Sequence, residues 1–106
     1  MTKLEKDIEQ KLRVTVNNLG GLCLKWVCPG WSGVPDRIIL MPGGHVIFAE
    51  LKRPKGGRLS PMQIFWRRKL QGFGFFVTYI FTDKDIETLT IILKDMGATL
   101  KSPTKD

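Results

Sequence analysis

The stretch from Gly33 to Lys52 constrains the fold of this chain most strongly, because it carries two apolar runs around a turn. The runs cover residues 34–41 and 45–51, and the break between them reads Pro42-Gly43-Gly44. Apolar segments with β-forming residues on both sides of a short Pro/Gly break are typical of a β-hairpin. We therefore expect two neighbouring antiparallel strands in this part of the chain.

The register of this hairpin decides whether two acidic side chains meet. If residues 42–44 form the loop, Met41 pairs with His45 and Asp36 lies opposite Glu50, whereas a loop of two or four residues separates the two acids. Opposed residues hold their Cβ atoms about 4.5–5.5 Å apart, so like charges there are destabilising. A divalent cation would relieve this repulsion, because Mg²⁺ binds carboxylate oxygens together with waters and phosphate.

Lys52 belongs to the same group of charges. Side chains alternate along a strand, so Lys52 shares the face of Glu50 while Leu51 points to the other face. An ammonium group beside two carboxylates and a cation can stabilise the charge that develops on a phosphate during hydrolysis. The alternative interpretation is a solvated hairpin edge on which these charges are scattered without a shared function.

The chain has 106 residues, which fits one domain, expected at residues 1–100, and a flexible tail at residues 101–106. No apolar run approaches the roughly 18–20 residues that cross a membrane, and the N-terminus lacks an apolar signal segment. Cys23 and Cys28 are too few for a disulfide framework, and their spacing matches no zinc site. We therefore expect a cytoplasmic protein without membrane contact.

Positive charge is concentrated in one part of the chain. Seventeen Lys and Arg residues against ten Asp and Glu residues give a net charge of +7, and no acidic residue occurs between residues 51 and 82. A basic segment that follows an acidic pair predicts contact with a phosphate backbone. The candidate DNA-contacting residues are Arg53, Lys55, Arg58, Arg67, Arg68 and Lys69.

Two other classes of function stay open from these patterns. A non-catalytic nucleic-acid-binding module would use the basic stretch together with exposed aromatic side chains such as Trp31 or Trp66. That class does not explain acidic residues placed against the phosphate path, because carboxylates without a metal weaken binding to phosphate. A structural or dimerisation protein would place its aromatic residues at an interface, although Trp26, Phe65 and Trp66 are explained more simply as core residues.

Hydrophobic periodicity predicts the elements around the hairpin. We expect helices at about residues 2–19, 61–71 and 83–96, and strands at about residues 22–28 and 75–81, the latter as a central strand. The second helix should bury its apolar stripe, which consists of Met62, Phe65, Trp66 and Leu70. The resulting order αβββαβα predicts an α/β fold, with a mixed central sheet flanked by helices and a C-terminal helix.

The order of elements and four short motifs together carry a resemblance. Gly33-Val34-Pro35-Asp36 is followed fourteen residues after the Asp by Glu50-Leu51-Lys52, with an acidic residue in the first helix and Gln63 in the second. This ordered set resembles the PD-(D/E)xK nuclease superfamily and, within it, the virus-type replication-repair nuclease (VRR-NUC) family. The resemblance covers about residues 4–82 and extends to the stand-alone members found in phages and bacteria.

The resemblance implies a restriction-endonuclease-like αβββαβ core and a structure-selective DNA endonuclease of the bacterial cytoplasm. The implied substrates are branched DNAs, such as four-way (Holliday) junctions or flaps in DNA repair. The implied cofactor is Mg²⁺ or Mn²⁺, with no organic cofactor. A homodimer is also expected, because symmetric processing of a four-way junction needs two sites related by a two-fold axis. Its candidate surface lies near Trp26, Trp31 and the last helix.

Individual roles also follow from the resemblance. It makes Asp36 and Glu50 metal ligands, with the backbone carbonyl of Leu51 as a third. Lys52 would position or activate the attacking water, or stabilise charge on the phosphate. Gln63 would orient the water or Lys52.

Two glutamates of the first helix compete for the family's remaining acidic position. Glu5 matches the family pattern better, because of its spacing to the glycines that end the helix, and Glu9 one turn later is the alternative. His45, at the hairpin turn, is expected at the surface and away from this chemistry.

Overall fold

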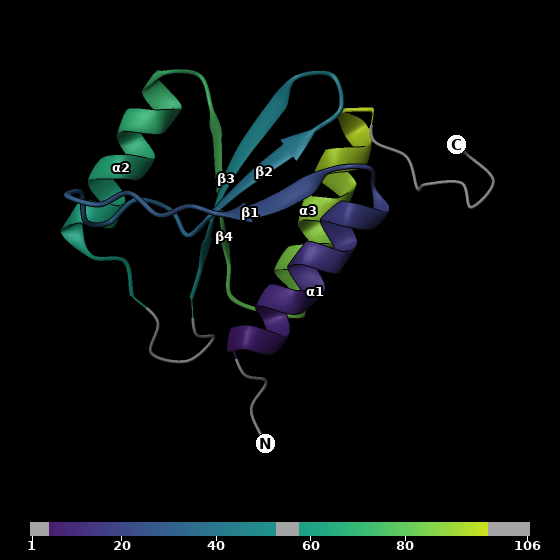
Figure 1. The fold of residues 1–106 in the computed structure, drawn as a ribbon, viewed down its shortest axis with the longest axis horizontal. Coiled ribbons are helices and arrows are strands. Elements are labelled where there is room, and N and C mark those ends of the chain that lie inside the picture. The colour runs from purple at the N-terminus through teal and green to yellow at the C-terminus, as the bar shows by residue number, and fades with distance from the viewer. Residues whose placement is uncertain (1–4, 53–57, 98–106) are drawn as a thin grey trace.

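The computed structural model describes residues 5–52 and 58–97, with the backbone alone for Glu5 (Figure 1). Its elements are α1 (Glu5–Asn18), β1 (Leu22–Lys25), β2 (Arg37–Met41), β3 (His45–Leu51), α2 (Pro61–Gly72), β4 (Phe76–Ile80) and α3 (Asp83–Asp95). The order αβββαβα agrees with the order expected from the sequence. The expected tail and the first three residues of the expected first helix lie outside the described residues.

The four described strands form one mixed sheet in the order β1-β2-β3-β4. β1, β2 and β3 pair antiparallel, whereas β4 pairs parallel with β3 after the chain crosses through α2. The expected fold class is therefore confirmed, but the expectation of a central strand at residues 75–81 is wrong. β4 lies at the edge of the described sheet. It is apolar because Val77 packs under α2 on one face and Ile80 joins the core on the other.

The β2–β3 hairpin has the three-residue loop, which is the register that sets Asp36 opposite Glu50. Met41 pairs with His45 and Arg37 pairs with Ala49, which leaves residues 42–44 as the loop. Gly43 and Gly44 both have positive φ values, 89° and 82°, which glycine adopts at little cost. Asp36 directly precedes β2, so the same register brings it to the Glu50 end of β3.

Helices cover the two faces of the sheet unequally. Figure 1 shows α2 on one side of the strands and α1 beside α3 on the other. The main core lies between α1, α3 and the sheet, and its fully buried members include Leu12, Val16, Ile39, Ile47, Ile80, Ile86, Leu89 and Leu93. A smaller core of Phe48, Leu70 and Val77 lies under α2. The half of the sheet formed by β1 and β2 has no described helix over its α2 side.

α2 does not bury the stripe predicted from the sequence. Leu70 is buried, but Met62 and Phe65 are 40% and 47% exposed, and Trp66 is half-buried. The reason is that α2 meets the sheet along a different line, which runs through Gln63 and Leu70 and leaves Met62 and Phe65 outside it. The predicted apolar stripe is therefore only partly buried, and Met62 and Phe65 lie on the surface of the protein.

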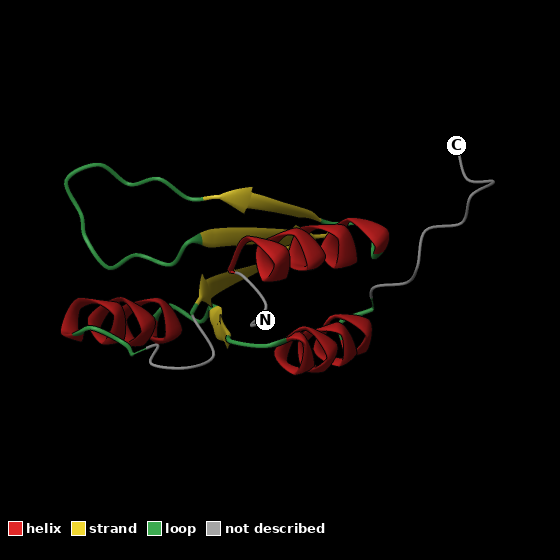
Figure 2. Ribbon diagram, turned by 90° about the horizontal axis from the view of Figure 1, so that it is seen from below, coloured by secondary structure: helices red, strands yellow, loops and turns green. Residues whose placement is uncertain are grey.

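β1 is shorter than expected, because it ends at Lys25 and the chain then leaves the sheet through residues 26–36. Figure 2 shows this loop extending beyond the ends of the strands. Burial raises the pKa of Cys23 on β1 to about 11, so its thiol stays protonated at neutral pH. His45 is exposed, as expected. Within the described residues, no helix has both the length and the apolar content needed to span a membrane.

Candidate active site

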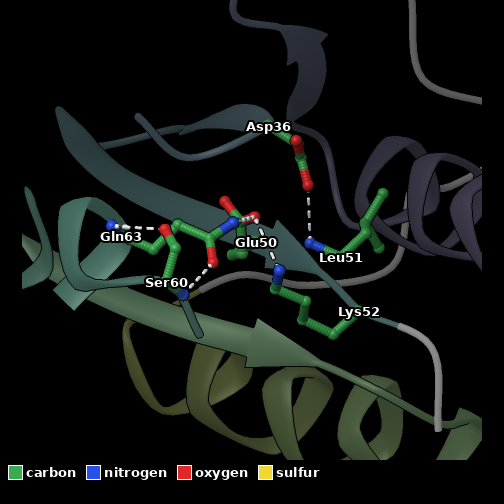
Figure 3. Close-up of polar contacts among 6 residues, drawn as sticks. All are labelled: Asp36, Glu50, Leu51, Lys52, Ser60 and Gln63. Carbon is green, nitrogen blue, oxygen red and sulfur yellow. Dashed lines mark hydrogen bonds and ion pairs between the residues drawn. The ribbon is translucent and has the colours of Figure 1, made fainter. Parts of the chain in front are cut away.

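Asp36 is held from two sides at the point where the 26–36 loop enters β2. Its carboxylate oxygen Oδ2 accepts a hydrogen bond from the backbone N–H of Leu51 at 2.9 Å (Figure 3). Its backbone carbonyl accepts a hydrogen bond from the N–H of Trp26 at 2.8 Å. The first bond ties the carboxylate to β3, one residue beyond Glu50. The second closes the base of the loop, so the position of Asp36 is fixed by both neighbouring strands.

Glu50 is a buried carboxylate, with 4% of its surface exposed. Its Oε2 accepts a hydrogen bond from Nε2 of Gln63 at 2.5 Å and lies 4.0 Å from Nζ of Lys52 (Figure 3). A carboxylate withdrawn from water is costly unless hydrogen bonds and opposite charges compensate it. Gln63 supplies a hydrogen bond and Lys52 supplies an opposite charge. These two contacts compensate the burial of Glu50 at a position where an apolar residue would otherwise be expected.

Gln63 is fixed by a capping box at the start of α2. Its Oε1 accepts a hydrogen bond from the N–H of Ser60 at 2.8 Å, and its own N–H donates to Oγ of Ser60 at 3.1 Å. With Oε1 used at the helix start, only the amide NH₂ group remains to reach the sheet. An NH₂ group donates to a carboxylate and not to an ammonium. Gln63 therefore contacts Glu50, whose Oε2 also lies near Lys52, and the expected role of Gln63 in orienting the water or Lys52 stays a prediction.

Lys52 follows β3 and remains attached to the sheet through its backbone. Its N–H donates to the carbonyl of Ile80 at 2.9 Å, and its side chain is 18% exposed. The alternation along β3 places its ammonium on the Glu50 side, as the hairpin register predicts. The ammonium group is thus partly withdrawn from solvent and beside a carboxylate.

The donors at this end of the sheet suit a hard divalent cation. Asp36 and Glu50 offer carboxylate oxygens from adjoining strand ends, and Oδ1 of Asp36 makes no hydrogen bond to any described residue. No cluster of three or more His, Cys, Asp or Glu side chains suitable for a metal occurs within residues 5–52 and 58–97. Mg²⁺ commonly binds one or two carboxylates and completes its shell with water and phosphate oxygens. The residues present fit that pattern.

Glu9 lines the same pocket as Asp36. A pocket of about 270 Å³ is lined by Glu9, Asp36, Leu51 and three basic residues, which are Lys6, Lys25 and Arg37. The Glu9 carboxylate forms an ion pair with the buried guanidinium of Arg37. The side chain of Glu5, the better match to the family motif, lies outside the described part of the chain.

Two basic residues of this pocket do not follow from the sequence pattern. Lys6 is on α1 and Lys25 ends β1, so nineteen positions separate them and no local cluster marks them. Folding brings both to the Asp36 pocket, where the charge of Arg37 is already matched by Glu9. The site therefore has basic residues on its α1 side as well as on its α2 side.

Tyr79 and Arg67 form a second pair next to Glu50 and Gln63. Tyr79 is the β4 partner of Glu50, and the Arg67 guanidinium lies 5.5 Å from the centre of its ring. Burial raises the pKa of the Tyr79 phenol, Arg67 opposes this rise and the Glu50 carboxylate adds to it. The Tyr79 hydroxyl is buried and has no hydrogen bond of regular geometry in the described part of the chain. Arg67, one turn after Gln63, thus faces the sheet and is not a fully exposed basic residue.

The other basic residues expected at DNA divide into two groups. Arg58, Arg68 and Lys69 are exposed, whereas Arg53 and Lys55 lie outside the described residues. Arg68 and Lys69 border a second pocket of about 380 Å³ on the outer side of α2, which Pro61, Ile64 and Phe65 complete.

Comparisons with known proteins found chains that are similar to this one. No protein-family model matches the sequence. The chain is 40% identical over 70 residues to "Putative nuclease p44" of Acyrthosiphon pisum secondary endosymbiont phage 1, an alignment that spans 66% of this chain and 74% of that protein. A solved structure described as "VRR_NUC domain" superposes with a TM-score of 0.76 at 26% identity, and the match covers 80% of this chain and 91% of that domain.

Proposed function

Because this chain belongs to the VRR-NUC family of nucleases, we propose that it hydrolyses phosphodiester bonds in DNA with a divalent metal held by Asp36 and Glu50. The metal would be Mg²⁺ or Mn²⁺, and the backbone carbonyl of Leu51 would supply a third ligand. The observation that carries this proposal is the burial of Glu50 between Gln63 and Lys52, one residue from the N–H group that binds Asp36.

The metal would polarise the scissile phosphate and lower the pKa of a water bound to it. Lys52 places a positive charge at the edge of the site, where it can stabilise the negative charge that builds up on the phosphate oxygens. Gln63 holds Glu50 in one orientation, and its own amide is oriented by Ser60. Glu9 or Glu5 adds a further acid from α1.

DNA reaches this site along basic surfaces on both sides. Arg58, Arg68 and Lys69 lie on the α2 side, and Lys6 and Lys25 border the Asp36 pocket on the α1 side. Phosphate contacts of this kind hold a duplex without reading its sequence. The proposed substrate is therefore chosen by its shape, and we place it among branched DNAs such as four-way junctions and flaps.

The experiment that tests the proposed function is cleavage of end-labelled duplex, flap and four-way DNA, each with Mg²⁺ and with a chelator. Hydrolysis that requires the metal and favours the branched DNAs is the expected result. A non-catalytic binding module would retain every DNA without cutting any of them. Cleavage of all three DNAs at equal rates would support the nuclease and contradict the preference for branched substrates.

A further inference from the structure

Trp31 is a large aromatic side chain on the surface of a loop that is firmly held. Trp31 is 60% exposed, yet its loop is closed at the base by the bond between the N–H of Trp26 and the carbonyl of Asp36. The indole Nε1–H of Trp66 on α2 donates to the carbonyl of Ser32 at 3.0 Å. A fixed loop that exposes a tryptophan presents a rigid aromatic face to solvent.

Gly33 anchors the same loop to the first turn of α2. A Cβ atom at this position would lie 2.6 Å from Cβ of Met62 and 2.8 Å from its carbonyl carbon, so the backbone approaches the helix as closely as glycine permits. Gln63, the residue that binds Glu50, follows Met62 directly. The loop that ends in Asp36 and the helix that carries Gln63 are therefore one packed unit at the edge of the candidate active site.

Three aromatic rings continue from this loop across α2. Trp31 meets Trp66 edge to face, with ring centres 5.6 Å apart, and Trp66 meets Phe65 in the same way at 5.4 Å. Phe65 is itself 47% exposed and borders the pocket that Arg68 and Lys69 share. We call Trp31, Trp66 and Phe65 the aromatic row.

The charge around the aromatic row favours a polyanion. No Asp or Glu occurs in residues 26–35 or in residues 51–82, which include the whole of α2. Arg68 and Lys69 lie beside Phe65. Exposed aromatic side chains on segments that carry cations and no carboxylate are the combination that binds single-stranded DNA, since the bases stack on the rings and the phosphates meet the cations.

We propose that the aromatic row, through Trp31, stacks against an unpaired nucleobase of the DNA substrate next to the candidate active site. This proposal rests on the proposed nuclease function and adds a preference within the branched DNAs, for flaps, which carry unpaired nucleotides next to the scissile position. In an uninterrupted duplex both faces of each base are already stacked, so the row has no partner there. Stacking accepts every base, which gives recognition of structure without recognition of sequence.

Binding of fluorescently labelled DNA in the presence of a chelator tests the proposal without cleavage. Three probes are compared, which are a duplex with a single-stranded overhang, the same duplex with an abasic overhang, and the blunt duplex. The wild type should bind the first probe most tightly, and Trp31→Ala should lose about 5- to 150-fold of that affinity. Trp31→Phe should retain most of it, and Phe65→Ala should lose part of it. Neither the abasic nor the blunt probe should respond to these substitutions.

Val27→Ala is the matched control, because Val27 is 68% exposed on the same loop and lies outside the aromatic row. Equal wild-type affinity for the natural and abasic overhangs would overturn the proposal, even if metal-dependent cleavage is observed. A Trp31→Ala variant that changes from dimer to monomer and weakens binding to all three probes equally would also overturn it, because Trp31 would then lie between two copies of the chain. If the protein stacks on the overhang but cleaves no DNA, that result would contradict the proposed nuclease function and support stacking by the aromatic row.

Discussion

Gln63 shows how one side chain can connect the start of a helix to a buried acid. Its side-chain oxygen Oε1 accepts a hydrogen bond from Ser60 in the capping box of α2, and its side-chain NH₂ group donates a hydrogen bond to Glu50. The sequence indicates the capping residues, because Ser60-Pro61 followed by Gln63 is typical of a helix start. The contact with Glu50 is not evident from the sequence, because it depends on where α2 lies over β3.

Gln63→Ala should slow DNA cleavage more than Ser60→Ala, although each substitution breaks one half of the capping box. Both variants should lose about 1 kcal/mol of folding stability, the usual cost of a lost cap. Only Gln63→Ala also removes the donor to Glu50. Single-turnover cleavage rates and thermal unfolding of the two variants measure this difference, and equal rates would assign Gln63 to the helix alone.

Lys52→Ala should reduce the cleavage rate about 10²- to 10³-fold, which is typical for removal of a group that stabilises transition-state charge. Its ammonium lies 4.0 Å from Glu50, so removing it should leave Mn²⁺ affinity unchanged or higher. Titration calorimetry with Mn²⁺ and single-turnover kinetics separate the two effects. If the variant loses only salt-sensitive DNA affinity, Lys52 is a phosphate contact and takes no part in the chemistry.

At the scale of elements, hydrophobic periodicity and turn residues predict which helices and strands form and in what order. Tertiary packing decides where each element lies and which of its faces is covered. The Pro42-Gly43-Gly44 turn and the order αβββαβα follow from the sequence. The hairpin register does not, because the sequence allows loops of two, three or four residues and only the structure shows that the loop has three. The edge position of β4 does not, because a strand covered by helices on both faces is apolar whether it is central or peripheral. The exposure of Met62 and Phe65 is missed for a related reason, since periodicity identifies an apolar stripe without identifying what covers it.

The 26–36 loop gives a prediction at this scale, because it carries Asp36 and packs on α2 through Gly33. Gly33→Ala should destabilise the protein by about 2–6 kcal/mol, the sum of a positive-φ penalty and an overpacked contact. It should also slow cleavage, since the loop must move away from α2. Gly30→Ala is the control, because Gly30 has a similar φ of 86° but no atom within 4 Å of the added methyl group. Equal losses in the two variants would show that the contact with Met62 contributes nothing.

For the whole molecule, the clearest candidate for contact between two copies is the half of the sheet that no described helix covers on its α2 side. Leu22, Leu24 and Leu40 are 54%, 45% and 37% exposed, and the β1–β2 register places Leu22 beside Leu40. A contiguous apolar patch of this kind is typical of interface cores. The sequence-based expectation for this surface is Trp26, Trp31 and the last helix, because the sequence does not show that β1 and β2 have no described helix over their α2 side.

We expect a two-fold symmetric homodimer that Leu24→Lys converts into a monomer. Sedimentation equilibrium at micromolar concentration measures the mass of each variant. Ile91→Lys on α3 is the control, because Ile91 is 68% exposed on the other side of the sheet and belongs to the surface expected from the sequence. A wild type that sediments as a single 12.1 kDa chain would contradict the dimer. Dissociation by Ile91→Lys alone would move the interface to α3.

The central claim is that Asp36 and Glu50 together hold the metal on which cleavage depends. Its most direct test is single-turnover cleavage of a labelled four-way junction by the wild type, Asp36→Asn and Glu50→Gln, with DNA binding measured in parallel in Ca²⁺. The wild type should cleave with Mg²⁺ and not with a chelator. Both variants should bind the junction and cleave it at least about a thousandfold more slowly, which corresponds to roughly 4 kcal/mol of lost transition-state stabilisation. Cleavage by either folded variant at the wild-type rate would contradict the account.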